Sequence, residues 1–199
     1  MISINQKKKG VCIVMKQKRM ALSICLVAMG ICINYVGGQL ALMMKLPIYL
    51  DSIGTILVSS LLGPIYGMLT PFISGVMMAF TGDIYSLYFA PVGMILGLVS
   101  GFVLKKIQKI GLSLLLVTLI ITIPGTVVCS IINAILFDGV TSSGSTVLVQ
   151  FLRNTPLGIT GAIFVVQVIT DYLDRFISLA LVMMVRKRIS NIAVLPHKA

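Results

Sequence analysis

The sequence contains no glutamate, no tryptophan and a single histidine, and it has few charges of any kind. Charged residues make up 11% of the 199 residues, whereas a typical soluble domain carries about 25%. Hydrophobic residues reach 58%, and the mean hydropathy is +1.08. Several apolar runs approach the roughly 20 residues that a helix needs to cross a bilayer. The composition therefore predicts an all-α integral membrane protein.

The scarcity of metal ligands and the lack of a phosphate-binding loop exclude several kinds of chemistry. His197 is the only histidine, and no metal-binding spacing joins the four cysteines, Cys12, Cys25, Cys32 and Cys129. We therefore expect no metal and no cofactor. The chain lacks the G-x-x-x-x-G-K-[ST] motif of ATP-hydrolysing domains, so any ATP-driven step belongs to a partner.

The net charge of +11 would suggest a nucleic-acid partner in a soluble protein, but here the cations flank apolar runs. We therefore attribute them to membrane topology and expect no nucleic-acid partner. The apolar runs predict a compact bundle of six membrane-spanning helices over residues 20–36, 48–62, 65–80, 87–104, 112–137 and 161–185. Gly37 and Gly38 are expected to end the first span, and residues 138–158, rich in Ser, Thr and Gly, to form a polar loop.

Charge asymmetry orients this bundle. Six spans would place residues 1–19, 63–64, 105–111 and 186–199 on one side of the membrane, and these segments hold thirteen of the sixteen Lys and Arg residues. Cytoplasmic segments are rich in Lys and Arg, so both termini are expected in the cytoplasm. The predicted organisation is a basic cytoplasmic tail (1–19), a six-helix transmembrane domain (20–188) and a cytoplasmic C-terminal tail (189–199).

Three ionisable residues, Asp171, Asp174 and Arg175, lie within the sixth predicted span. Asp171 and Asp174 share a helix face, and Arg175 stands four residues after Asp171, at ion-pair spacing. With a rise of ~1.5 Å per residue, Asp171 lies roughly 22 Å from the cytoplasmic anchor at Arg186. Two interpretations stay open: an ion pair that only stabilises the bundle, or a site in which at least one of the three residues contacts a substrate.

Other polar residues gather at the predicted outer ends of the spans and favour a pocket that opens outward, although loop ends are often polar for no functional reason. Asp51 stands where the second span begins; it is expected to cap that helix, to contact substrate, or both. Tyr85 and Tyr88 are candidate stacking surfaces. The candidate substrate-binding residues are Asn34, Asp51, Tyr85, Tyr88, Asn133, Arg153, Asp171 and Asp174.

Small residues recur at helical spacing on the first, third and fourth spans, which predicts close helix packing. On the fourth span they form the ladder Gly93, Gly97 and Gly101. On the first span the small residues Ala21, Cys25 and Ala28 form a stripe that suits docking of another membrane protein.

The segments "YLDSIGTILVSSLLGPIYGMLTPFISG", "YSLYFAPVGMILGLVSGF" and "ITDYLDRFISLALVMMVRKR" resemble the substrate-binding S component of an energy-coupling factor (ECF) vitamin transporter. The resemblance implies a multi-pass protein of the bacterial cell membrane that captures a small vitamin or vitamin precursor from outside. It also implies partners, a transmembrane coupling subunit and two cytoplasmic ATPases. The family docks through an Ala-x-x-x-Ala pattern on its first helix, for which the match is Ala21, Cys25 and Ala28, with cysteine in place of the second alanine.

Three other functions compete with this one. A stand-alone proton-coupled transporter would use Asp171 and Asp174 as its proton site. A membrane enzyme would hold a metal between the same two residues, but it needs further acidic or histidine ligands. A purely structural subunit would bind no small molecule. The mixture of tyrosines and polar groups suits a small, flat, hydroxylated heterocycle such as a pyridoxine-like or pyrimidine-like vitamin, and a carboxylate-bearing vitamin would use Arg153.

Overall fold

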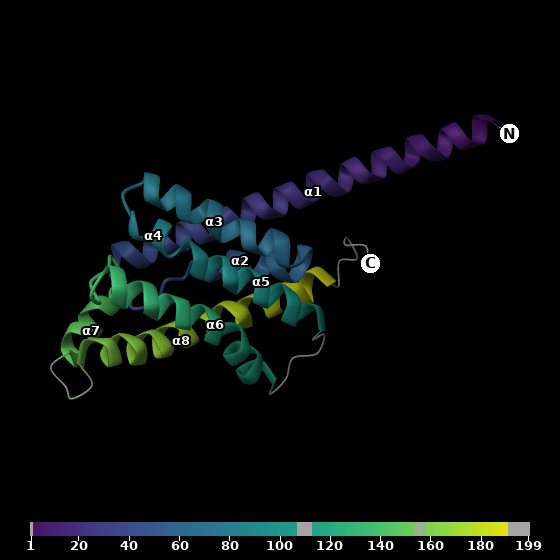
Figure 1. The fold of residues 1–199 in the computed structure, drawn as a ribbon. Helices are drawn as coiled ribbons and strands as arrows, with labels where there is room; N and C mark the ends of the chain where they lie inside the picture. Colours follow the sequence, from purple (N-terminus) through teal and green to yellow (C-terminus); the bar gives the residue numbers. More distant parts are fainter. Residues whose placement is uncertain (1, 107–112, 154–155, 157, 191–199) are drawn as a thin grey trace.

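The computed structural model describes residues 2–106, 113–153, 156 and 158–190, and all the regular secondary structure in this part of the chain is α-helical, without strands (Figure 1). The all-α prediction is therefore confirmed. The described helices are α1 (Ile2–Met43), α2 (Ser52–Leu62), α3 (Pro64–Phe80), α4 (Tyr85–Tyr88), α5 (Ala90–Lys106), α6 (Ser113–Leu136), α7 (Ser145–Leu152) and α8 (Gly158–Ser190).

Helix α2 is short but central, because it packs against α1, α3, α5 and α8. Helices α6 and α8 lie side by side, and α7 packs against α8 at the end of the molecule where α4 joins α3 to α5 (Figure 1). We call this the α4–α7 end. Helix α1 ends near the α4–α7 end, and the irregular segment 44–51 leads from there back into α2.

Helix α1 continues through Gly37 and Gly38 to Met43, so the predicted end of the first helix at these glycines is wrong. The two residues permit close packing instead. A methyl group on Gly37 would overlap the carbonyl oxygen of Leu50, and one on Gly38 would press on the side chain of Met78. Glycine inside a helix thus marks a close approach of neighbouring chain, as it commonly does in membrane helices. Because α1 begins at Ile2, the predicted basic tail and first span belong to one helix.

Three further boundaries differ from the sequence prediction. The second helix begins at Ser52 rather than at residue 48, since the segment before it is irregular. The predicted loop 138–158 contains α7, and the fourth predicted span, 87–104, begins within a separate short helix, α4. The third to sixth predicted spans otherwise correspond closely to helices α3, α5, α6 and α8. Most of the predicted C-terminal tail, 189–199, lies outside the described residues.

The glycine ladder on α5 packs tightly, as predicted. A methyl group on Gly97 would overlap the carbonyl oxygen of Gly67, and one on Gly101 would overlap the backbone of Pro64. Both neighbours belong to α3. The ladder therefore brings the backbones of α3 and α5 together and fixes one wall of the bundle.

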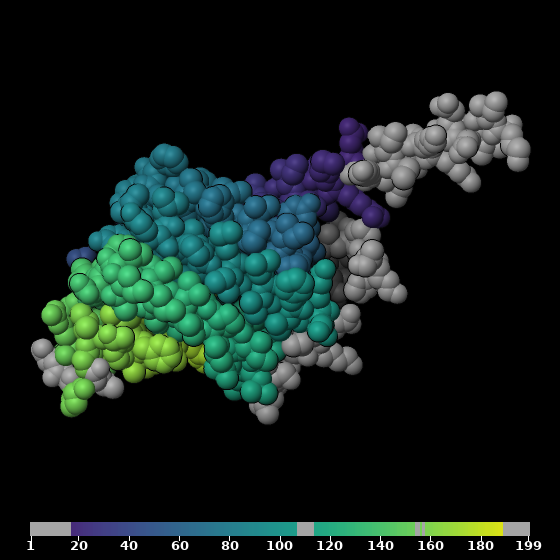
Figure 2. Space-filling model, in the orientation of Figure 1, coloured from purple at the N-terminus to yellow at the C-terminus, as the bar shows by residue number. Residues whose placement is uncertain are grey.

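The surface of the described chain is rich in large apolar side chains, such as Ile24 (62% exposed), Leu116 (65%) and Ile135 (76%). Two stretches, Gln17–Met43 and Leu114–Leu136, are long and apolar enough to cross a membrane, with mean hydropathies of 2.0 and 2.5. Helix α1 extends beyond the other helices (Figure 1), and α3, α5 and α6 cover most of the face drawn in Figure 2. Large exposed apolar areas of this kind indicate contact with a membrane or with another protein.

Candidate functional site

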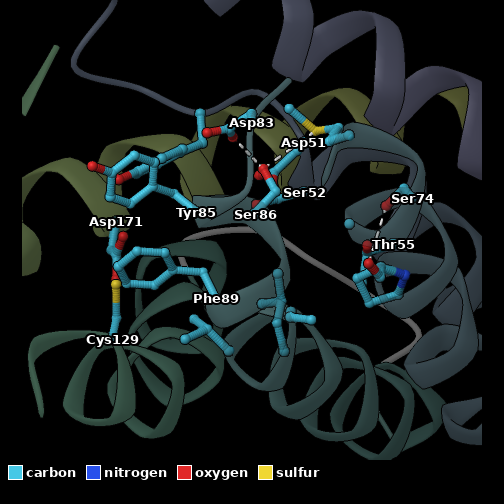
Figure 3. A pocket seen from close by; sticks show the side chains of 18 of the residues that line it. Asp51, Ser52, Thr55, Ser74, Asp83, Tyr85, Ser86, Phe89, Cys129 and Asp171 are labelled. Atoms are coloured by element: carbon cyan, nitrogen blue, oxygen red, sulfur yellow. Dashed lines mark hydrogen bonds between the residues drawn. The ribbon is translucent and has the colours of Figure 1, made fainter. Parts of the chain in front are cut away.

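A cavity of about 70 Å³ lies toward the α4–α7 end, enclosed by residues of α2, α3, α4, α5, α6 and α8 and of the loops that join them (Figure 3). Its charged lining residues are Asp51, Asp83, Asp171 and Arg175. Its aromatic lining residues are Tyr49, Tyr85 and Phe89, and its hydroxyl groups include those of Ser52, Thr55, Ser74, Ser86 and Thr141. The cavity is therefore polar, although the helices around it are mostly apolar.

The ion pair predicted on α8 is present. The Arg175 guanidinium lies 3.0 Å from Oδ1 of Asp171, one helical turn earlier, and Thr126 of α6 donates to Oδ2 of Asp171 at 2.7 Å. Asp171 is 1% exposed and Arg175 5% exposed. Both carboxylate oxygens of Asp171 are thus engaged, whereas Nε of Arg175 has no hydrogen-bond partner among the described residues.

Asp174 has other hydrogen-bond partners than Asp171, although it stands only three residues later on α8. Its Oδ1 accepts a hydrogen bond from the backbone N–H of Leu50 at 2.8 Å, and its Oδ2 accepts one from the Ser52 hydroxyl. Asp174 therefore anchors the irregular segment before α2, and it does not line the cavity.

Asn34 of α1 caps the start of α2 from outside that helix. Its Oδ1 accepts hydrogen bonds from the backbone N–H groups of Gly54 (2.8 Å) and Thr55 (3.2 Å), and its Nδ2 donates to the Thr55 hydroxyl at 2.8 Å. The first N–H groups of a helix lack partners within it, so an acceptor from a neighbouring helix satisfies them. Asn34 does not line the cavity, and its placement here is structural.

Asp51 occupies the N-cap position of α2, but its side chain makes no capping hydrogen bond. The prediction that this carboxylate caps the helix is therefore wrong. Asn34 and Asp174 already accept from the N–H groups of Leu50, Gly54 and Thr55. The carboxylate of Asp51 instead lines the cavity.

Aromatic residues cover the cavity at the α4–α7 end. The ring of Phe137, just after α6, lies 4.9 Å from that of Tyr85, 5.5 Å from that of Tyr88 and 5.8 Å from that of Phe89. Tyr85 and Phe89 line the cavity, whereas Tyr88 is 49% exposed and does not. Beside them, Ser86 donates a hydrogen bond to Oδ2 of Asp83. Helix α4 thus forms a lid held by contacts with Phe137.

The structure brings together three of the predicted binding residues, Asp51, Tyr85 and Asp171, at one cavity. Asn133 is buried in α6 but does not line it, and Arg153 is exposed at the end of α7. The docking candidates Ala21, Cys25 and Ala28 all lie exposed on α1.

The sequence prediction missed several lining residues, among them Ser74, Ser86, Phe89 and Cys129. Serine and cysteine within apolar helices normally pack as small residues, so they carried no binding signal. Phe89 follows the predicted stacking residues Tyr85 and Tyr88 directly, and that proximity is the one signal that would have indicated it.

A larger groove of about 390 Å³ lies between α6 and α8, but it has no charged side chain in its lining. Apolar residues such as Leu119, Ile123 and Phe164 make up most of it. Among the described residues, no three His, Cys, Asp or Glu side chains are grouped so as to hold a metal ion. The smaller polar cavity is therefore the candidate site.

No protein-family model, curated protein or solved structure matches this chain. The function is therefore inferred from the chain's residues and from the geometry of the cavity.

Proposed function

We propose that the chain is the membrane-embedded, substrate-binding S component of an ECF-type importer, which captures a small vitamin or precursor from outside the cell. The observation that carries this proposal is a polar cavity with aromatic walls inside a bundle of otherwise apolar helices. In the proposed topology, six spans cross the bacterial cell membrane, both termini lie in the cytoplasm, and the α4–α7 end faces outward.

The distribution of side chains supports a membrane location. Polar groups such as Asn34, Gln167 and Asp171 are buried, whereas large apolar side chains are exposed on most helices. Water would penalise this arrangement, but lipid chains solvate an apolar surface at no cost. The cationic ends of α5 and α8, at Lys105–Lys106 and Lys187–Arg188, lie where the positive-inside rule requires cytoplasmic charge.

The size of the cavity implies that the lid moves. Ligand pockets typically occupy about 300–1,000 Å³, so a cavity of about 70 Å³ has to enlarge before it admits a vitamin. Helix α4 is the element best placed to move, because it is only four residues long and follows Gly82, whose φ is 113°. In this proposal, α4 opens for substrate entry and closes on Phe137 behind the substrate.

The exposed stripe Ala21, Cys25 and Ala28 is the proposed docking face for the coupling subunit, with two ATPases supplying the energy. Small residues allow a partner helix to approach closely, and the bundle leaves this face of α1 uncovered. We expect Ala28→Leu to abolish uptake in cells but to leave substrate binding unchanged. Leu22→Phe, which adds bulk at an exposed position of the same helix outside the stripe, is the matched control. Unchanged uptake by Ala28→Leu would show that the coupling subunit does not dock on this face of α1.

The central experiment is thermal unfolding of the purified protein in detergent against a panel of B vitamins and their precursors. A ligand that binds only the folded state stabilises it by RT ln(1 + [L]/Kd), ~4 kcal/mol at a thousandfold excess over Kd. We expect one compound or one close group of compounds to raise Tm. A panel without any shift would contradict the binding function.

A proton-coupled carrier is the second candidate, and one observation favours it. Asp171 and Asp174 lie buried on one turn of α8 beside a single cation, Arg175, and Asp51 lines the adjoining cavity. Such groups commonly form proton relays in transporters. This function predicts uptake into liposomes by the chain alone, abolished by an uncoupler. Uptake that requires the ATPases and withstands the uncoupler would exclude it.

A further inference from the structure

The cavity wall carries more negative than positive charge. Of the described residues, Asp51, Asp83 and Asp171 line it as carboxylates, and Arg175 is its only lysine or arginine. Asp171 already engages Arg175 in the 3.0 Å ion pair. One face of the guanidinium is therefore occupied by Asp171, and neither Asp51 nor Asp83 forms an ion pair with a described residue.

These two carboxylates also accept few hydrogen bonds. The Asp51 side chain makes no capping bond, and the nearby backbone N–H groups donate to Asn34 and Asp174 instead. Oδ1 of Asp83 is buried and without a partner, although its Oδ2 accepts from Ser86. A carboxylate away from water is costly unless it is paired, and pairing with a positive group recovers most of that cost.

The rest of the wall suits an organic cation better than a bare ion. Tyr49, Tyr85 and Phe89 present aromatic rings to the cavity, and ring faces attract ammonium and other delocalised cations. The Nε–H of Arg175, which has no partner among the described residues, can donate to a polar group on the same ligand, and the Ser52 hydroxyl oxygen can accept from one.

We propose that the cavity selects a small organic cation, a protonated amine or a positively charged heterocycle, whose charge pairs with Asp51. This inference rests on the proposed binding function and narrows its substrate class. A cationic ligand excludes the carboxylate-bearing vitamin that the sequence associated with Arg153. Arg153 is also exposed and lies outside the cavity, so it cannot pair with a ligand there.

Thermal unfolding in detergent tests the inference with a matched pair of probes. Pyridoxamine and pyridoxine differ by one group, because pyridoxamine carries an ammonium where pyridoxine carries a hydroxyl. Thiamine is a second cationic probe, and riboflavin, biotin and pantothenate are the neutral or anionic comparisons. We expect Tm to rise with a cationic compound only. A rise with a neutral or anionic compound alone would overturn the cation inference and leave the binding function standing. No rise with any compound would overturn both.

Variants then test the role of Asp51. Asp51→Asn removes the charge at constant shape and should weaken binding of the cationic probe roughly tenfold or more, since bonds between charged groups are the strong ones. Asp138→Asn is the matched control, because Asp138 is exposed outside the cavity and asparagine tolerates its φ of 47°. Should Asp51→Asn fail to fold, Asp51→Ser removes the same charge with a smaller side chain. Unchanged affinity in the folded variant would overturn the assignment.

Discussion

The bundle interior has two halves, both buried, that differ in the polarity of their side chains. Toward the α4–α7 end, α8 contributes Gln167, Asp171 and Arg175 to a largely polar interior, beside a small apolar cluster of Val149, Ile163 and Val166. Beyond them the same helix contributes Leu179 and Val182 to an apolar cluster with Ile56, Leu57, Leu96, Leu104, Val117 and Ile121. The apolar half needs only complementary shape. The polar half needs a partner for each donor and acceptor, so it is stabilised only in a specific arrangement.

That difference predicts where changes are most costly. A group removed from the apolar half leaves a void, whereas one removed from the polar half leaves a charge or a dipole without a partner. The polar half already contains unpaired groups, such as the amide of Gln167, Oδ1 of Asn133 and Nε of Arg175. Natural cores pair nearly all such groups. Most of the unpaired ones among the described residues lie toward the α4–α7 end, which favours a region kept for binding rather than for stability.

The largest effect is expected from Asp171→Asn. The change leaves the buried Arg175 charge without its ion pair, which should lower the free energy of unfolding by about 3–5 kcal/mol. Denaturant unfolding in detergent measures it. Asp171→Leu combined with Arg175→Met removes both charges and should recover most of the loss. If the single variant costs less than about 1 kcal/mol, the pair behaves like an exposed one and the contrast between the two halves fails.

In the apolar half, Leu179→Ala should cost about 2–5 kcal/mol, because the side chain is 1% exposed and its removal leaves a cavity. Leu181→Ala is the matched control on the same helix, at a position that is 43% exposed, and it should stay within about 0.5 kcal/mol of the parent. Equal losses from the two variants would show that the helices pack differently from the described arrangement.

Asn34→Ala should lower stability by about 0.5–2 kcal/mol, the usual range for a lost helix cap. Affinity for any ligand that raises Tm should stay unchanged, because Asn34 holds the start of α2 and does not reach the cavity. Titration of the ligand into parent and variant separates the two roles. A variant that keeps its stability but loses affinity would make Asn34 a binding residue.

The sequence predicted the helical class, most helix limits, the ion pair on α8 and the tight packing of the glycine ladder, because each of these depends on local spacing. It did not predict that Asn34 rather than Asp51 caps α2, since this depends on which helices cross. Gly37 misled the prediction for the same reason: a glycine that ends a helix and one that admits a neighbouring chain look alike in sequence. The polar lining was found only where the residue was charged or aromatic.

The smallest effect, and the one of opposite sign, is expected from Gln167→Met. Gln167 is fully buried, and neither its Oε1 nor its Nε2 has a partner among the described residues, so it loses its hydration without compensation. Methionine has a similar length and no strong polar atom, and it should raise stability by about 1 kcal/mol. Gln39→Met is the matched control and should be neutral or slightly destabilising, because Nε2 of Gln39 donates to the Thr81 hydroxyl at 3.0 Å. A loss of stability in Gln167→Met would mean that buried water satisfies the amide, and the polar half would then be as fully paired as an ordinary core.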